Sequence, residues 1–193
     1  MKKLLLLSLT TFIFISCGAP ETDETIDGVP SLSHRLFVSS QTYNGSLGGL
    51  DGADAKCDSL AKAAGLKKTY KAILSSSSLS AYGRLLFTGE ILKVSSSDNS
   101  ILIADSGADL FNTDTTDLKS LANLDESGNT ISSNVWTGTG SDGSNLSDNC
   151  NNWASSSGSI DAWHGDSTKT NERWLESNFT SCNNNYSLYC VSQ

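Results

Sequence analysis

Gly48-Gly49-Leu50-Asp51-Gly52-Ala53-Asp54-Ala55-Lys56-Cys57 is the stretch that decides the fold, because it begins the one clear helix that the sequence predicts. Asp51 is interpreted as the N-cap, with a second acid, Asp54, three residues later. Apolar residues then recur at helical spacing until Gly65 ends the helix, namely Ala53, Cys57, Leu60, Ala61 and Ala64. Cys57 is therefore expected on the buried face of this helix.

Short strands are predicted on both sides of the helix. Arg35–Ser39 is an apolar, β-branched run, and Tyr70–Leu74 alternates as a strand does. Leu79–Leu92 predicts a second short helix, although Gly83 and Gly89 weaken that pattern.

From Ser95 onward the chain is rich in Ser, Asn, Asp and Gly, and its apolar residues form brief islands. Each island is interpreted as a short strand or a buried plug: Ile101–Ile103, Ala108–Phe111, Asn134–Thr137 and Leu188–Val191. The sequence thus predicts a single α+β domain with a small mixed or antiparallel sheet, one clear helix and long loops.

The N-terminus has the pattern of a secretory signal. Lys2 and Lys3 precede the mostly apolar run Leu4–Ile15, and Phe14-Ile15-Ser16-Cys17 resembles a bacterial lipobox. We therefore expect residues 1–16 to be a lipoprotein signal peptide, Cys17 to be lipidated, residues 17–33 to form an acidic flexible tether, and residues 34–193 to fold. The alternative is an ordinary signal peptide that is cleaved at a neighbouring small residue.

Charge and composition exclude several classes of partner. With 13 basic and 21 acidic residues the chain has a formal net charge of −8, so it lacks the clustered cations that nucleic-acid binding requires. The sequence has two histidines and no Cys-x-x-Cys pair, which disfavours a zinc site. We expect no metal and no cofactor. Besides Cys17, four cysteines remain, an even number that predicts disulfides in an exported protein.

Several segments together carry a resemblance to a known family: Arg35–Val38, Gly48–Cys57, Trp136–Thr139 with Asp142-Gly143, Cys150–Trp153, Trp174 ahead of Cys182, and Leu188–Cys190. The chain resembles a domain-of-unknown-function family of spirochaete (leptospiral-type) surface lipoproteins with a C-type-lectin-like, endostatin-like fold. That resemblance implies two disulfides, Cys57–Cys190 and Cys150–Cys182.

Calcium-dependent sugar binding and catalysis are both disfavoured. Classical lectins of this fold place a cis-proline in their calcium loop, and residues 34–193 contain no proline. The acidic turn Asp142–Asn145 and the pair Asp161 and Asp166 are interpreted as ordinary turns. His34 and His164 lie in no catalytic motif, so we do not expect an enzyme.

The four tryptophans divide into two groups. Trp136, Trp153 and Trp174 are expected in the core. Trp163 lies in a polar stretch with His164 and Asp166, and these three residues are the candidate ligand site. Trp163 has two open interpretations, a binding anchor on a loop or a plug beneath it.

The expected function is that of a lipid-anchored protein of the outer membrane, exposed at the cell surface. Its lectin-like domain is expected to bind host matrix proteins, plasma proteins or glycans without calcium. The alternative is a structural or assembly component of the envelope with no external ligand.

Overall fold

The computed structural model describes residues 25–26, 29–30, 33–85, 87–94, 101–113 and 115–193. The chain divides into two compact units, residues 1–31 and residues 32–193. In the first unit β1 (Thr25–Ile26) pairs antiparallel with β2 (Val29–Pro30), within the stretch 17–33 that we expect to be a flexible tether. Cys17 and the signal peptide lie outside the described residues, so lipidation stays a prediction.

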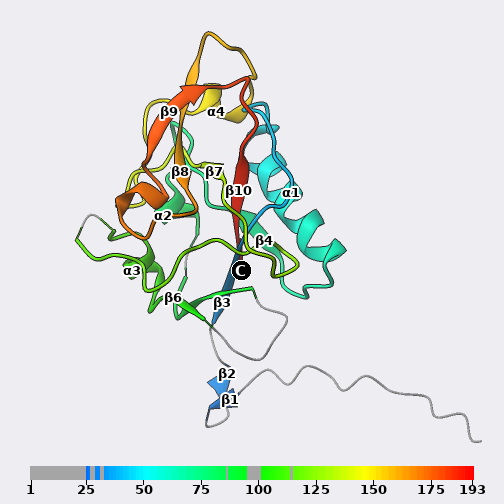
Figure 1. Ribbon diagram of the computed structural model, residues 1–193, viewed down its shortest axis with the longest axis vertical. Helices are drawn as coiled ribbons and strands as arrows, with labels where there is room; N and C mark the ends of the chain where they lie inside the picture. The colour runs from blue at the N-terminus through cyan, green and yellow to red at the C-terminus, as the bar shows by residue number, and fades with distance from the viewer. Residues whose placement is uncertain (1–24, 27–28, 31–32, 86, 95–100, 114) are drawn as a thin grey trace, which may run out of the picture. The chain divides into compact units, whose positions relative to one another are not determined.

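The second unit contains one main helix and a mixed sheet that has eight strands among the described residues (Figure 1). The strand order is β6-β5-β3-β10-β7-β8-β9, and β4 also pairs with β10. Two pairs are parallel, β3 with β5 and β10 with β7, and the other pairs are antiparallel. The strands are β3 (His34–Val38), β4 (Tyr70–Ala72), β5 (Ile91–Lys93), β6 (Leu102–Ala104), β7 (Asn134–Trp136), β8 (Asp161–Asp166), β9 (Asn178–Ser181) and β10 (Ser187–Ser192).

The central strand β10 is buried along its whole length. Leu188 and Cys190 pack on one face of the sheet, and Tyr189 and Val191 pack on the other. The sheet therefore separates two apolar clusters, and a strand buried on both faces needs no polar positions. This explains why the sequence is continuously apolar over Leu188–Val191.

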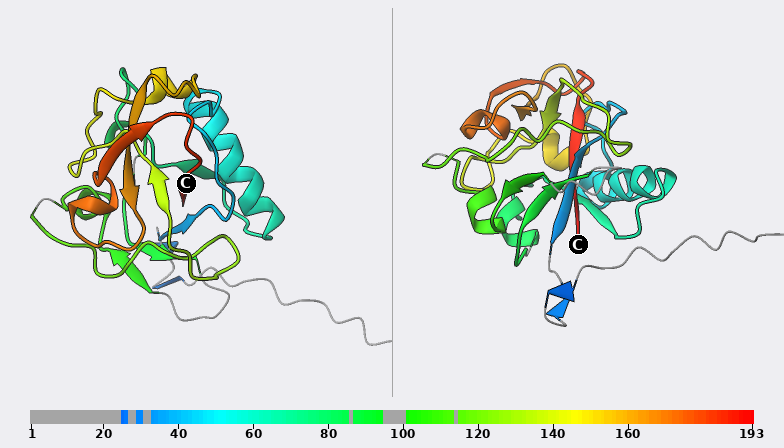
Figure 2. Two further views of the ribbon diagram at one scale, coloured as in Figure 1. Left: turned by 45° about the horizontal axis from the view of Figure 1, so that its top comes forward. Right: turned by 60° about the horizontal axis from the view of Figure 1, so that its bottom comes forward.

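The two clusters are covered by different elements. The main helix α1 (Gly49–Ala63) covers one cluster with Ala53, Cys57, Leu60 and Ala61 (Figure 2). The other cluster is closed by α2 (Ala81–Arg84), α3 (Gly107–Leu110) and the 3-10 turn η1 (Glu172–Trp174). None of the helices in the described part of the chain is long and apolar enough to span a membrane.

The predicted helix exists, but it begins earlier than expected. Its N-cap is Gly48 with a left-handed backbone, so Asp51 lies in the first turn and does not cap the helix. At the other end Gly65 adopts φ +80°, the left-handed conformation that glycine supplies after a helix.

One further prediction was right only in part, and another was confirmed in one of its two forms. The short helix expected within Leu79–Leu92 is limited to α2, which ends at Arg84, and Ile91–Lys93 pairs with β3 as a strand. The island Ala108–Phe111 was expected to be a short strand or a buried plug, and the structure shows the plug: Leu110 ends α3, Phe111 follows it, and both are buried.

Disulfides join Cys57 to Cys190 and Cys150 to Cys182, the pairing that the family resemblance implies. The first links α1 to the central strand β10. The second links the segment before β8 to the end of β9. The first therefore ties the main helix to the middle of the sheet, and the second ties the loop-rich segment before β8 to the edge of the sheet.

Candidate functional site

The segment before β8 contains a run of four consecutive non-glycine residues with positive φ. Cys150, Asn151, Asn152 and Trp153 have φ values of 53°, 56°, 56° and 62°, so the segment labelled α4 (Cys150–Trp153) in Figure 1 is a left-handed turn. Such a conformation costs about 1–2 kcal/mol per L-residue, less for Asn. A run of this length must therefore be held by its surroundings.

Four hydrogen bonds and one disulfide hold the left-handed turn. The Asn149 side chain accepts the backbone N–H of Asn152 at 2.8 Å, and Cys150 is tied to Cys182. The buried Trp153 indole donates to the Ser75 carbonyl at 2.7 Å. The Trp153 carbonyl in turn accepts the N–H groups of Leu47 and Gly48. The turn is thus fixed to the loop that enters α1 and to the loop that follows β4.

An open hollow of about 580 Å³ lies beside this turn, and we call it the polar hollow. Seven of its eight lining residues are polar, namely Ser77, Ser147, Asp148, Asn149, Asn151, Ser159 and Asp161, and the eighth is Ile160. Asn149 is buried, and its side-chain amide donates to the Ser77 hydroxyl. Asn151, Asp148 and Asp161 are exposed, so their side chains are available to a ligand.

Trp163 lies in β8 and not in a polar loop, which corrects our interpretation of this stretch. It is half-buried and pairs across the sheet with Phe179 of β9. The two rings meet edge to face with centroids 5.6 Å apart, and Phe179 is 53% exposed. Trp163 and Phe179 form what we call the aromatic pair.

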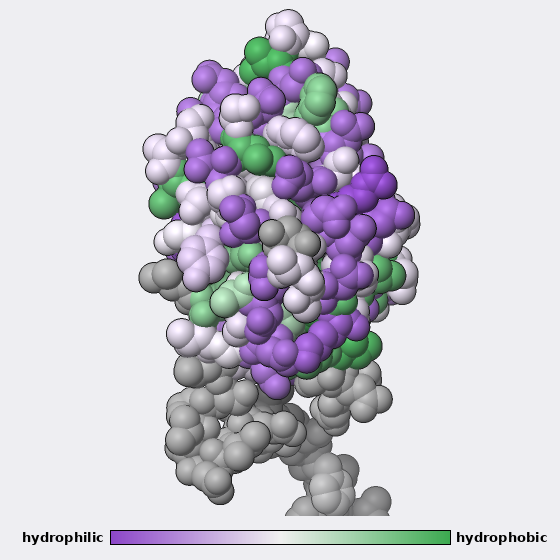
Figure 3. Space-filling model, turned by 90° about the vertical axis from the view of Figure 1, so that its left-hand side faces the viewer, coloured by the Kyte–Doolittle hydropathy of each residue, from purple (hydrophilic) through white to green (hydrophobic). Residues whose placement is uncertain are grey.

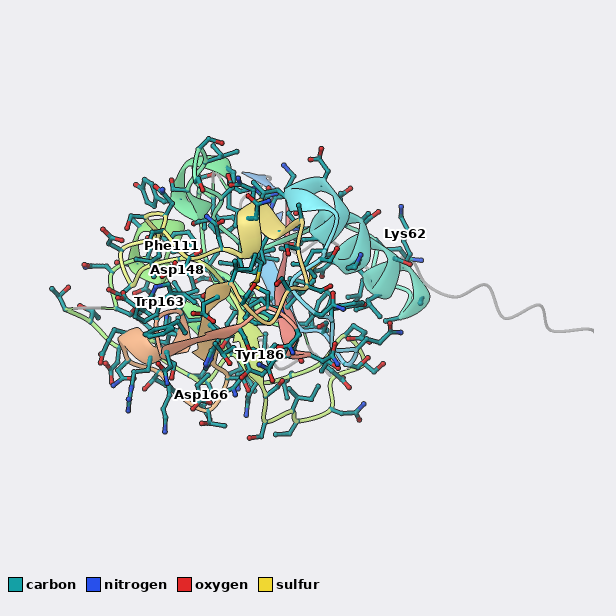
Figure 4. The ribbon with its side chains drawn as sticks, turned by 90° about the horizontal axis from the view of Figure 1, so that it is seen from above. Lys62, Phe111, Asp148, Trp163, Asp166 and Tyr186 are labelled. Carbon is teal, nitrogen blue, oxygen red and sulfur yellow. A yellow bond between two sulfur atoms is a disulfide. The ribbon has the colours of Figure 1, made fainter. Side chains whose placement is uncertain are left out.

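The aromatic pair adjoins the polar hollow. Asp161 lines the hollow and lies two positions before Trp163, hence on the same face of β8. The backbone N–H of Trp163 donates to the carbonyl of Asp148, another lining residue, at 3.0 Å. Asp148 and Trp163 lie close together in Figure 4. Over the side of the domain where β9 runs, hydrophilic residues dominate and hydrophobic ones form small separate patches (Figure 3).

His164 and Asp166 do not join Trp163, because successive residues of a strand point to opposite faces. His164 is buried, and its ring packs edge to face on Tyr186 at 4.9 Å (Tyr186 and Trp163 are labelled in Figure 4). Burial lowers the pKa of His164 below its usual 6.5. Asp166 caps its own turn by accepting from the Thr168 N–H and hydroxyl. The predicted site thus splits between the two faces of β8.

The acidic residues that we considered as possible calcium ligands do not lie together. Asp161 and Asp166 stand at the two ends of β8, about 16 Å from each other at the rise of a strand. Asp142 accepts the Ser144 N–H at 2.9 Å, and hydrogen bonds from Ser144 lower the pKa of this carboxyl. No group of three or more His, Cys, Asp or Glu side chains converges within the described residues.

From the sequence, several residues of this surface were not identified as candidates for binding. Phe179 is a single aromatic residue among polar neighbours, and only its cross-strand pairing reveals that it adjoins Trp163. Asn151 was noted from the sequence only within Cys150–Trp153, a segment that carries the family resemblance, and not as a candidate binding residue. Trp136, Trp153 and Trp174, by contrast, are fully buried, as predicted.

A family model described as a protein of unknown function (DUF1554) matches residues 40–173, more than half of the chain. The matched residues include all those that line the polar hollow and also Trp163, whereas Phe179 lies beyond them. Among curated proteins no match is found.

Proposed function

We propose that this domain, which belongs to the DUF1554 family of proteins of unknown function, binds a ligand without catalysis. The family description assigns no activity, so the proposal is based on the surface of the domain. The ligands proposed are host matrix proteins, plasma proteins or glycans. One observation carries the proposal: a partly exposed aromatic pair, Trp163 and Phe179, lies directly beside a polar hollow. Aromatic anchors next to hydrogen-bonding groups are typical of binding surfaces.

The rigidity of the surroundings supports this proposal. The polar hollow is bordered by the left-handed turn, which the Cys150–Cys182 disulfide and the Trp153 indole hold in place. Recognition residues on a rigid scaffold lose little conformational entropy when they bind. All four cysteines of the described domain are in disulfides, so none is a free thiol nucleophile.

We also propose that the α+β domain has a C-type-lectin-like, endostatin-like fold. Its support is a disulfide from the first long helix to the central, last strand, with a second disulfide in the loop-rich segment. Binding is proposed to be independent of calcium, because Asp142 is engaged in its own turn and residues 34–193 lack proline.

The proposed location is the outer surface of the envelope, with the domain anchored by lipid at Cys17. The support is the lipobox-like sequence Phe14-Ile15-Ser16-Cys17 after an apolar run. A Cys17→Ala variant tests it. Loss of fatty-acid labelling and of membrane association is expected, and unchanged labelling would contradict the anchor. Protease treatment of intact cells tests surface exposure.

A binding screen tests the function. The folded domain is presented to arrays of matrix proteins, plasma proteins and glycans, with and without a calcium chelator. For any ligand found, Trp163→Ala should weaken binding by about 2 kcal/mol, roughly 30-fold, with little loss of fold stability.

Ile101→Ala is the matched control for this screen. Ile101 is 43% exposed next to β6, at the opposite edge of the sheet from β9, so its removal should not affect binding. If Trp163→Ala lowers the melting temperature and leaves the affinity of the folded protein unchanged, Trp163 is a plug and the proposed site is wrong.

A further inference from the structure

The charges that border the polar hollow are all negative. Its two titratable lining residues are Asp148 and Asp161, and both are exposed. The Asp161 carboxylate has no hydrogen bond or ion pair within the described residues, and Asp148 has only a 3.5 Å contact with the hydroxyl of its neighbour Ser147. The hollow therefore carries two carboxylates that the folded domain does not neutralise.

Two carboxylates favour a cationic ligand, and the aromatic pair next to them favours a cation as well. A tryptophan ring attracts a cation over its face, more strongly than the other aromatic side chains do. Asp161 lines the hollow and shares one face of β8 with Trp163, so the carboxylates of the hollow and the indole are neighbours on one surface, although Trp163 is not itself a lining residue. The Asn151 side chain adds a carbonyl oxygen that accepts from an N–H donor.

The net charge of the whole chain also favours a cationic ligand. At a net charge of −8 the chain attracts cations over long range, and complementary charge raises the rate of association. A phosphate or sulfate group finds no Lys or Arg among the lining residues of the hollow. The hollow is open, so it suits a side chain presented by a macromolecule better than an enclosed small molecule.

We propose that the polar hollow and the aromatic pair together dock a lysine- or arginine-rich segment of a partner protein. Asp148 and Asp161 pair with its cationic groups, Trp163 lies beside one of them, and Asn151 accepts a hydrogen bond. This inference rests on the proposed function, since it names the partner class for that same surface.

The test compares two variants of the folded domain with equal charge change. Asp148→Asn with Asp161→Asn removes the carboxylates of the hollow and keeps their size. Asp51→Asn with Glu90→Gln removes two exposed carboxylates elsewhere, on α1 and before β5. The probes are fluorescent hexa-arginine and hexalysine peptides, with hexaglutamate and maltohexaose as comparisons.

The expected result is binding of the two basic peptides that weakens with salt. It should fall about tenfold or more in the Asp148→Asn/Asp161→Asn variant. The Asp51→Asn/Glu90→Gln variant should lose less than about twofold, as charge removed far from the site affects mainly screened long-range attraction. Trp163→Ala should also weaken binding.

Equal losses in the two double variants would overturn the inference, since the peptides would then sense only net charge. Calcium binding that disappears in Asp148→Asn/Asp161→Asn would overturn it in favour of a metal site. If maltohexaose or a protein from the screen binds through Trp163 but is indifferent to both carboxylates, the proposed function stands and this inference falls. If Trp163→Ala changes no binding at all, the proposed function fails.

Discussion

Arg84 provides the sharpest test of the packing between α1, β4 and α2. Its guanidinium donates to the Asp54 carboxylate and to the Ala72 carbonyl, each at 2.6 Å. Asp54 in turn accepts the Ala72 N–H at 2.9 Å. The side chains of Arg84 and Asp54 are only 7% and 19% exposed. One ion pair therefore joins three elements out of contact with most of the solvent.

Arg84→Met removes the guanidinium and keeps most of the apolar stem. Loss of one partner from a buried pair costs about 3–5 kcal/mol, because the other charge is left desolvated. The partial exposure of Asp54 puts the expected loss near the lower limit, at about 3 kcal/mol. For a domain of this size that corresponds to a melting temperature lower by about 6–12 °C.

Lys119→Met is the control, because its ion pair with Asp105 has side chains that are 50% and 55% exposed. Pairs of this kind contribute about 0–1 kcal/mol. Urea unfolding of both variants, followed by circular dichroism, measures the two losses in free energy of unfolding. If Arg84→Met and Lys119→Met differ by less than about 1 kcal/mol, the argument that burial makes the Arg84 pair important is wrong.

Three other predictions concern stability. Replacing Cys150 and Cys182 together by Ala should lower the free energy of unfolding by about 3.7 kcal/mol, because the disulfide closes a loop of 32 residues and so restricts the unfolded chain. A loss near zero in urea unfolding would contradict this loop-entropy estimate. Burial lowers the pKa of His164 in the folded state, so the unfolded state binds the proton at higher pH and stability should fall as pH decreases through 6.5. His164→Gln should therefore reduce the change in melting temperature between pH 7.5 and pH 5. The same pH dependence in the variant and in the original protein would refute this. The Tyr189 hydroxyl is buried without a hydrogen-bond partner within the described residues, so Tyr189→Phe should be neutral or stabilising by up to about 1 kcal/mol, and a clear loss in calorimetry would show that the hydroxyl is satisfied.

Local patterns predicted the parts of the fold that local physics determines. The periodicity around Cys57 identified α1, and the β-branched run at Arg35 identified β3. The helix start was placed too late because a left-handed Gly48 ends the preceding loop, and no side-chain cap marks that position. Ile91 and Leu92 were included in a predicted helix because their strand pairing depends on β3, more than fifty residues earlier in the chain.

The candidate site was harder to predict because long-range contacts create it. Trp163 was recognised as unusual, but its neighbour Phe179 became visible only through the pairing of β8 with β9. His164 and Asp166 were grouped with Trp163 by sequence proximity, whereas the alternation of a strand separates them. The left-handed turn at Cys150–Trp153 depends on a disulfide and on hydrogen bonds to Ser75 and Leu47, which no local pattern encodes.

The position of β10 at the middle of the sheet has a consequence for how the protein is made. Its partners β3, β4 and β7 all precede it in the chain, so they wait for residues 187–192 to emerge before the sheet can close. Cys57 likewise waits for Cys190, while Cys150 emerges 40 residues before Cys190 does. Oxidation in the order of emergence would first join Cys57 to Cys150, so correct maturation requires either delayed oxidation or disulfide exchange by an isomerase.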